Sequence, residues 1–271
     1  MKYGTLWSRE ESVLALYLYC QIPFAQTKAG NPEVVRLANV LERTPSSVAR
    51  KLGNFGAFDP LLAEKGIVGL THTSRIDREV WDEFYGRWNA LVNEAHALMS
   101  ESVVIETREL DDDMPVISKP IQTDREATVL VRLCQSFFRK SVLTAYDNKC
   151  CLCGLDLVPL LMASHIIPWS VGVEQRVDPQ NGLCLCRLHD AAFDRGLIGI
   201  KENFEIALSS KLRKSQSSFV VLTLHNYEHK LLMKPRRLAP RREYLSWHLN
   251  NVFVPWRKGF RDEPAARLEG D

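Results

Sequence analysis

The sequence predicts an α+β protein with a mainly helical N-terminal part and a C-terminal part that combines helices, strands and a metal site. Three observations support this fold class. Apolar residues recur at helical spacing through much of the first hundred residues. Five of the seven cysteines and two of the seven histidines lie between residues 149 and 200. After residue 199, runs of apolar and β-branched residues at 204–208 and 218–224 are typical of strands.

Length and composition are those of a folded intracellular protein. The 271 residues suffice for two domains with hydrophobic cores, and 45% of them are hydrophobic and 25% charged. The sequence begins without an apolar signal segment, and no run approaches the roughly 20 apolar residues that span a bilayer. An odd number of cysteines in two short clusters suits a reducing compartment. We therefore expect a cytoplasmic protein that does not enter a membrane.

The N-terminal part is predicted to be a bundle of helices. Ser8 and Glu11 have the spacing of a capping box at the start of the first helix. Residues 53–74 contain glycines and turn residues, which suggests a short strand pair or wing. Residues 75–99 are predicted to form one long helix. Its aromatic stripe, which includes Trp81 and Trp88, belongs either to the core or to a dimer interface.

Two short helices joined by a tight turn are predicted between residues 32 and 53. Pro32 suits the first turn of a helix, Thr44 is a capping residue for the second, and Gly53 is expected to end it. This arrangement matches a helix-turn-helix, whose second helix can enter the major groove of DNA. A plain helical hairpin used for packing is the alternative. The predicted DNA contacts on the second helix are Ser46, Ser47, Arg50 and Lys51.

Charge is unevenly distributed along the chain, although its net value is only +2. Residues 201–260 contain twelve Lys and Arg against four Asp and Glu, whereas residues 101–126 contain eight acidic residues against three basic ones. A basic C-terminal part suggests a polyanionic partner, and clustered arginines between prolines suit phosphate contacts. A solvated basic surface is the alternative. The arginines predicted to contact DNA are Arg236, Arg237, Arg241 and Arg242.

The acidic stretch is interpreted as an interdomain linker. The predicted division is a helical DNA-recognition or dimerisation domain at 1–100, a linker at 101–126, a second domain at 127–260 and a disordered tail at 261–271.

Two pairs of potential metal ligands flank the centre of the second domain. Cys150 and Cys153 form a CxxC pair, and Cys186 and His189 form a CxxH pair. Four such ligands are the set that a tetrahedral structural zinc requires. The alternatives are that these thiols are simply buried in a core, or that the ligand pairs are Cys151 with Cys153 and Cys184 with Cys186.

Polar residues at close intervals accompany the two pairs. The segments are Ser164-His165-Ile166-Ile167-Pro168-Trp169, Asp178-Pro179-Gln180-Asn181-Gly182-Leu183 and Asp190-Ala-Ala-Phe193-Asp194-Arg195-Gly196. Over residues 137–200 this series resembles the HNH endonucleases, which have the ββα-metal (His-Me finger) fold. In that family a strand carries the first His, a loop with the Asn follows, and a helix supplies the last motif residue. The matching positions are His165 and Asn181, followed by Asp194 if His189 binds zinc, or His189 itself if zinc is absent.

The resemblance implies a phosphodiesterase mechanism. His165 would be the general base that takes a proton from water, and Asn181 would fix the loop and orient it. Asp194 would be a ligand of a catalytic Mg²⁺ or Mn²⁺, with Asp190 as a second candidate. One departure is Ser164, because many members carry an Asp or His ligand directly before the catalytic His.

We therefore expect a metal-dependent endonuclease that acts on double-stranded DNA, with a structural Zn²⁺ and a restriction or defence role by analogy. A double-strand break would require a homodimer or two successive nicks. Two alternatives stay open. One is a catalytically inactive, zinc-stabilised DNA-binding regulator, which Ser164 favours. The other is a zinc protein that acts through protein contacts, with the helix of Trp81 and Trp88 as its interface.

Overall fold

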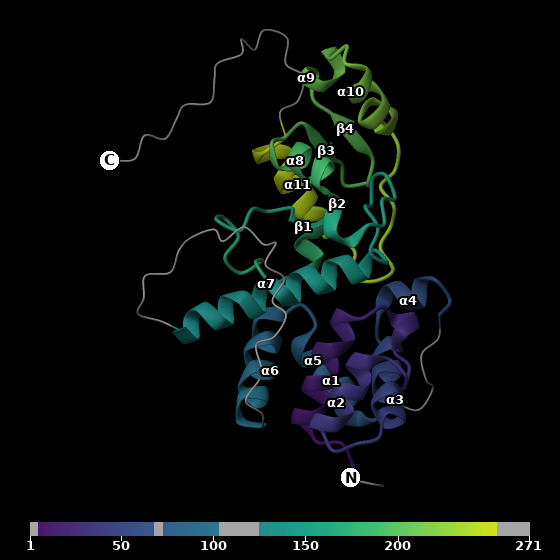
Figure 1. The fold of residues 1–271 in the computed structure, drawn as a ribbon, viewed down its shortest axis with the longest axis vertical. Helices are drawn as coiled ribbons and strands as arrows, with labels where there is room; N and C mark the ends of the chain where they lie inside the picture. Colours follow the sequence, from purple (N-terminus) through teal and green to yellow (C-terminus); the bar gives the residue numbers. More distant parts are fainter. Residues whose placement is uncertain (1–4, 68–72, 103–124, 254–271) are drawn as a thin grey trace.

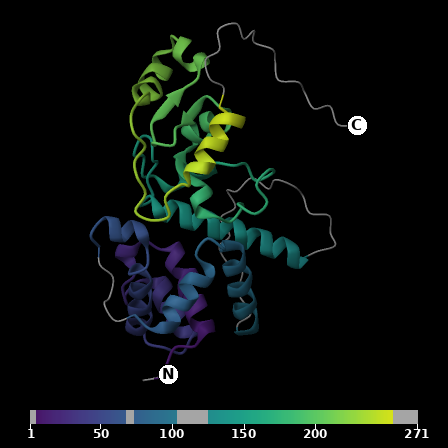
Figure 2. The same cartoon turned by 180° about the vertical axis from the view of Figure 1, so that it is seen from behind.

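The computed structural model describes residues 5–67, 73–102 and 125–253. Helices dominate these ranges, and two short antiparallel strand pairs lie in the C-terminal half, so the predicted α+β class is confirmed. Figures 1 and 2 show the N-terminal helices at one end of an elongated molecule and the strands at the other. Most of the predicted linker (103–124) and the predicted disordered tail lie outside the described residues. No helix in the described ranges is both long and apolar enough to cross a bilayer.

The N-terminal helices begin at the residues whose side chains cap them. Ser8 and Glu11 form both hydrogen bonds of the predicted capping box. Asn31 and Thr44 each accept a backbone N–H at the start of the two predicted short helices, which pack on each other. The helices of this part are α1 (Arg9–Gln21), η1 (Phe24–Gln26), α2 (Pro32–Val40), α3 (Pro45–Gly56), α4 (Pro60–Glu64), α5 (Arg75–Phe84) and α6 (Trp88–Ser102).

Two details of this half differ from the sequence prediction. The second short helix continues through Gly53 to Gly56, and α4 follows it, so the described part of 53–74 holds helices rather than a strand pair. The single helix predicted for 75–99 is also wrong. Tyr85 is extended and Gly86 has a φ of +83°, a left-handed conformation that glycine adopts at little cost, so the chain turns between α5 and α6.

The aromatic stripe of α5 and α6 lies in the core. Trp81 stacks on Tyr85 with ring centroids 4.9 Å apart and also contacts Phe55, and Trp88 is buried in the same cluster. Because these rings are covered by α1, α3 and their own helix pair, the interface alternative for Trp81 and Trp88 is wrong.

Helix α7 (Arg125–Ala145) lies between the two halves (Figure 1). Phe137 is buried in the N-terminal core, where it stacks on Tyr17, and its neighbour Phe138 is buried in the C-terminal core. Burial of one such ring contributes roughly 1.5–3 kcal/mol. Thr144, near the end of the same helix, donates a hydrogen bond to the Gln21 carbonyl of α1. One helix therefore contributes to both cores.

The C-terminal half contains the ββα arrangement that the resemblance implies. Strand β1 (Leu161–His165) pairs antiparallel with β2 (Gly182–Cys186), which leads directly into α8 (Arg187–Asp194). His165 faces Gly182 across the pair. A Cβ at Gly182 would lie 2.3 Å from Val142 of α7, so glycine at this position lets the strand pair sit against that helix.

The remaining elements pack around this unit. They are η2 (Val158–Leu160), η3 (Pro179–Asn181), β3 (Ile198–Ile200), β4 (Ile206–Leu208), α9 (Ser210–Lys214), α10 (Ser218–Thr223), η4 (His225–Tyr227) and α11 (Arg242–Asn251). The predicted strand at 204–208 is confirmed in its last three residues as β4. The strand predicted for 218–224 is wrong, because this run is α10. Its more buried residues, Val220 and Leu224, are four apart, whereas Phe219 and Leu222 are exposed.

Candidate active site and metal centre

Four side chains from two neighbouring segments converge into a Cys/His cluster. Cys150 and Cys153 lie in the turn after α7, Cys186 precedes α8, and His189 lies in its first turn. Their potential ligand atoms all lie within 4.8 Å of one another, and no other such group of three or more occurs in the described ranges. His189 Nδ1 is 3.2 Å from the Cys186 Sγ and 3.5 Å from the Cys150 Sγ.

These distances suit a tetrahedral metal ion. Bonds of about 2.3 Å to sulfur and about 2.0 Å to nitrogen place tetrahedral ligand atoms about 3.5 Å apart. The other ring nitrogen of His189 donates to the Thr223 carbonyl at 3.2 Å, which directs the Nδ1 lone pair at the thiols. His189 therefore belongs to the cysteine cluster, and the four residues can hold one metal ion.

The thiols inside and outside this cluster differ in environment. A hydrogen bond with Cys186 lowers the pKa of Cys150, and the same bond with burial raises the pKa of Cys186 to about 11. Cys151 and Cys184 are instead buried among apolar side chains, where the Cys151 N–H donates to the Cys184 carbonyl. Burial raises the pKa of both thiols. The alternative ligand pair is therefore part of the hydrophobic core.

His165 ends β1 and is held on three sides. Its ring stacks on Phe138, with centroids 3.7 Å apart, and Trp169 approaches it edge-on at 5.7 Å. The Nε2 atom lies 2.9 Å from the Arg176 carbonyl oxygen. Because a carbonyl can only accept, Nε2 carries the proton and Nδ1 is the unprotonated nitrogen. Desolvation lowers the pKa of His165 to about 4.

Asn181 fixes the loop between β1 and η3. Its side-chain oxygen accepts from the Ile167 N–H at 2.8 Å, and its amide group donates to the carbonyls of Ile167 and Gln175. The Ile166 N–H also donates to the Asn181 carbonyl. Asn181 is fully buried, so these bonds replace those it would make with water. The backbone on both sides of the His165 loop is thereby held in place.

Two carboxylates of α8 face the end of β1. Asp190 and Asp194 are four residues apart on the helix, and the buried Ser164 hydroxyl lies beside both and donates to Asp194 at 3.5 Å. Although Asp194 is exposed as a residue, desolvation of its carboxylate and repulsion from Asp190 raise its pKa to about 6. Desolvation also raises the pKa of Asp190. Two like charges held together in this way favour a shared cation.

The predicted DNA contacts on the second helix divide into exposed and buried residues. Ser46 and Arg50 are exposed and Ser47 is half-buried. Lys51 is 4% exposed and forms a buried ion pair with Asp77, so its assignment as a DNA contact is wrong. The helical pattern allowed Lys51 on the outer face, but a carboxylate of α5 draws it into the core.

The predicted arginine contacts divide in the same way. Arg237 is 1% exposed and donates to the carbonyls of Tyr19, Cys20 and Ile22 at the end of α1. It satisfies the last carbonyls of that helix and cannot reach DNA, so this prediction is also wrong.

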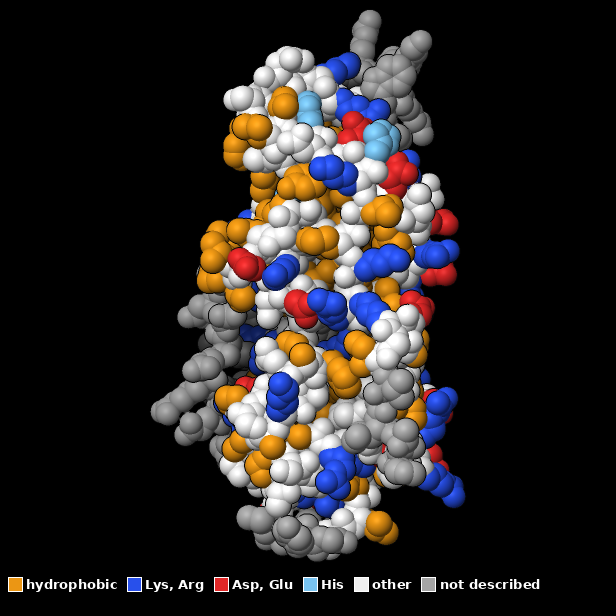
Figure 3. All heavy atoms as spheres, turned by 90° about the vertical axis from the view of Figure 1, so that its right-hand side faces the viewer, with side chains coloured by type: hydrophobic (Ala, Val, Ile, Leu, Met, Phe, Trp, Pro, Cys, Tyr) orange, Lys and Arg blue, Asp and Glu red, His pale blue; other side chains and the backbone are white. Residues whose placement is uncertain are grey.

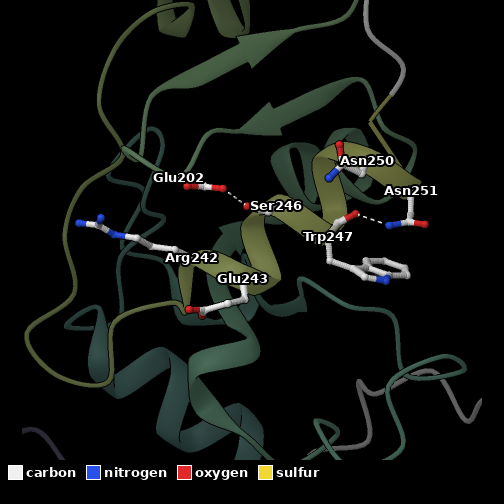
Figure 4. A pocket seen from close by; sticks show the side chains of 7 residues that line it. All are labelled: Glu202, Arg242, Glu243, Ser246, Trp247, Asn250 and Asn251. Atoms are coloured by element: carbon white, nitrogen blue, oxygen red, sulfur yellow. Dashed lines mark hydrogen bonds between the residues drawn. The ribbon is translucent and has the colours of Figure 1, made fainter.

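The other three arginines are accessible. Arg236 is exposed and pairs with Asp147 at 2.6 Å, and Arg241 is half-buried beside Tyr244. Arg242 is exposed at one end of a shallow groove along α11, with Trp247 toward the other end (Figure 4). On the face shown in Figure 3, Lys and Arg side chains are spread over the length of the molecule and do not form one patch.

Sequence reasoning missed Phe138 and Arg176 as neighbours of His165. In the sequence Phe138 is one more apolar residue at helical spacing, and nothing in the spacing of Arg176 distinguishes it from a surface cation. Their proximity to His165 depends on the packing of α7 against β1 and on the path of the loop.

Comparison with known protein families gives a match over part of the chain. Residues 150–201 match the family model described as HNH endonuclease. This segment contains the Cys/His cluster, His165, Asn181 and the two carboxylates of α8. No curated protein matches the chain.

Proposed function

We propose, from the premise that residues 150–201 form an HNH endonuclease domain, that the protein is a metal-dependent endonuclease that hydrolyses DNA. An HNH domain supports a nuclease-type function with DNA as substrate. The observation that carries the mechanism is the setting of His165. Its Nε2–H is bonded to the Arg176 carbonyl, its Nδ1 is free of a proton, and a carboxylate pair adjoins the preceding residue.

His165 is the general base of this mechanism. Desolvation keeps its pKa near 4, so the imidazole is neutral at pH 7 and can take a proton from the attacking water. The stacked Phe138 ring and the Arg176 carbonyl fix the ring plane, which limits the directions in which Nδ1 can accept a proton. After the transfer, the Arg176 carbonyl continues to accept from Nε2 and stabilises the imidazolium.

Asp194 and Asp190 would hold the catalytic Mg²⁺ or Mn²⁺. Oxygen donors suit these hard cations, and a bound cation would relieve the repulsion that raises the pKa of Asp194. When bound, the cation supplies Lewis-acid stabilisation of the charge that develops on the phosphate and on the leaving 3′ oxygen. Ser164 orients the Asp194 carboxylate through the hydrogen bond that its hydroxyl donates.

The Cys/His cluster would hold a structural Zn²⁺. Three thiols and one imidazole fill all four tetrahedral positions and leave none for a substrate, which is typical of a structural site. The cluster joins the end of α7 to the start of α8, so zinc would fix the helix that carries both carboxylates.

The partners and biological role are proposed more broadly. The substrate is double-stranded DNA, and the helical pair α2–α3, with Ser46, Ser47 and Arg50, is a second candidate contact region. A homodimer is proposed for double-strand cleavage, because one active site cuts one strand. A restriction or defence role in the cytoplasm rests on analogy with free-standing nucleases of this layout. The division at 1–100 and 127–260 is likewise a proposal.

A specific observation favours one alternative, an inactive zinc-stabilised DNA-binding regulator. Ser164 stands where many family members have a metal ligand, and a hydroxyl is a weak ligand. A plasmid-nicking assay distinguishes the nuclease from the inactive regulator. With Mg²⁺, the wild type should nick supercoiled DNA, His165→Ala should not, and His229→Ala, which changes an exposed histidine, should match the wild type. DNA binding with equal, negligible nicking by wild type and His165→Ala would support the regulator.

A further inference from the structure

The loop after β1 holds an arginine beside the proposed general base. Arg176 Nε donates to the Trp169 carbonyl at 2.8 Å, and its guanidinium carbon lies 5.1 Å from the centre of the Trp169 ring. The same ring meets His165 edge-on, with centroids 5.7 Å apart. The indole therefore touches both the imidazole of His165 and the guanidinium of Arg176.

The backbone of Arg176 is anchored as firmly as its side chain. Its carbonyl accepts from His165 Nε2, and the carbonyl of the preceding Gln175 accepts from the Asn181 amide. One residue earlier, the Glu174 carbonyl accepts from the Asn89 amide of α6. Three successive carbonyls are thus bonded to three different side chains, and this fixes the position of Arg176 relative to His165.

The guanidinium retains donors for a ligand. In the ranges that the structure describes, it contacts the carbonyl and ring of Trp169, and no carboxylate forms an ion pair with it. The bond to Trp169 uses Nε, so the two terminal nitrogens remain. Arginine residues commonly bind phosphate through two parallel N–H donors, and a ring that supports the guanidinium plane reduces the entropy lost on binding.

We propose that Arg176, supported by Trp169, forms a phosphate-binding subsite that holds the DNA backbone beside His165. The inference rests on the proposed nuclease function and adds a substrate contact to it. Arg176 contacts a phosphate of the cleaved strand and positions it for attack by the water that His165 deprotonates. The contact is independent of sequence, because every nucleotide presents the same phosphate oxygens.

Arg176→Gln tests this subsite because it removes the charge and leaves the backbone carbonyl that holds His165. Arg213→Gln is the matched control. It removes the same charge from α9, where Arg213 pairs with Glu228. Nicking of supercoiled plasmid with Mg²⁺ should fall about 100-fold in Arg176→Gln, the scale for loss of one preorganised donor, and remain unchanged in Arg213→Gln. Arg176→Lys keeps the charge but lacks the planar guanidinium, so its nicking rate should lie between those of Arg176→Gln and Arg213→Gln.

DNA binding provides a readout that a purely structural role would not change. In the His165→Ala background, the slope of log affinity against log salt concentration should decrease in magnitude by about 0.9 on adding Arg176→Gln, because one phosphate contact is lost. Thermal melting of each variant verifies folding, and the Lys variant provides the test if the Gln variant does not fold. If the wild type nicks DNA and His165→Ala does not, equal nicking rates and salt slopes in Arg176→Gln and Arg213→Gln would overturn the subsite alone. If His165→Ala nicks like the wild type, the proposed nuclease mechanism fails.

Discussion

The rings of Phe138 and His165 stack on each other, with their centroids 3.7 Å apart and an angle of 8° between their planes. Phe138 comes from α7 and His165 from the end of β1, so a helix outside the matched 150–201 segment helps to build the proposed active site. The adjacent Phe137 enters the other core. The pair offers a natural comparison, because the same substitution at each position acts on a different part of the molecule.

We expect Phe138→Leu to impair catalysis more than Phe137→Leu does. Loss of the stacked ring would admit water and loosen the imidazole, so the pKa of His165 should rise from about 4 toward its ordinary value near 6.5. The nicking rate should fall between about 10- and 100-fold, the scale for small misplacements. NMR titration of the imidazole and initial rates would measure both effects. An unchanged imidazole pKa in Phe138→Leu, or the same change in Phe137→Leu, would contradict the assigned role of the stack.

Stability should fall as the pH decreases from about 6.5 to about 4, partly because of two buried histidines. Desolvation lowers the pKa of both His165 and His248 to about 4. Between these pH values the histidines of the unfolded chain bind protons and those of the folded chain do not, so protonation favours unfolding. The stabilisation that the two neutral histidines contribute is therefore fully present only above pH 6.5. His248→Phe should reduce the slope of the unfolding free energy against pH, measured by urea denaturation. An identical slope in that variant would show that His248 does not titrate this way.

The Cys/His cluster predicts about one zinc ion per chain. Cys186→Ser should lose the zinc and lower the melting temperature, because zinc binding contributes directly to folding. Cys184→Ala provides the control, because Cys184 is near Cys186 in the sequence but is buried in the hydrophobic core and is not part of the cluster. It should retain the metal, as measured by elemental analysis of the purified protein. Zinc-free wild type, or zinc retained in Cys186→Ser and lost from Cys184→Ala, would refute the assignment of ligands.

Arg50 and Lys51 are neighbours in α3, but substitution of Lys51 should change stability, whereas substitution of Arg50 should change DNA binding. Lys51→Ala should destabilise the fold by about 3–5 kcal/mol, because Asp77 would remain as an uncompensated buried charge. Arg50→Ala should leave stability within about 0.5 kcal/mol and weaken DNA binding at low salt. Denaturant unfolding and fluorescence anisotropy with a labelled duplex separate the two. Unchanged DNA affinity in Arg50→Ala would favour a packing role for the α2–α3 pair.

The sequence contained enough to predict the Cys/His cluster, because its ligands lie in two local motifs with fixed spacing. The fold class and the caps at Ser8 and Thr44 were likewise predictable from residue type and local pattern. These features depend on neighbours within a few residues. The order of β1, β2 and α8 followed from the family resemblance rather than from periodicity.

What could not be predicted depends on distant partners. Lys51 and Arg237 resemble surface cations in sequence, but Asp77 lies 26 residues from the first, and the carbonyls at the end of α1 lie more than 200 residues from the second. The short apolar run of α10 fits a strand or a helix equally well, and burial of Val220 and Leu224 against the C-terminal core favours the helix. Arg176 acquires its significance only through the path of the loop around His165.

The rate of single-turnover plasmid nicking with Mg²⁺, compared between wild type and His165→Ala, tests the central claim most directly. Both proteins should contain the same amount of zinc per chain, so that the comparison is between two proteins that fold and bind DNA equally well. Loss of a positioned general base should reduce the rate by about 10²–10⁴-fold. Equal rates in the two proteins would contradict the assignment of His165 as the catalytic base.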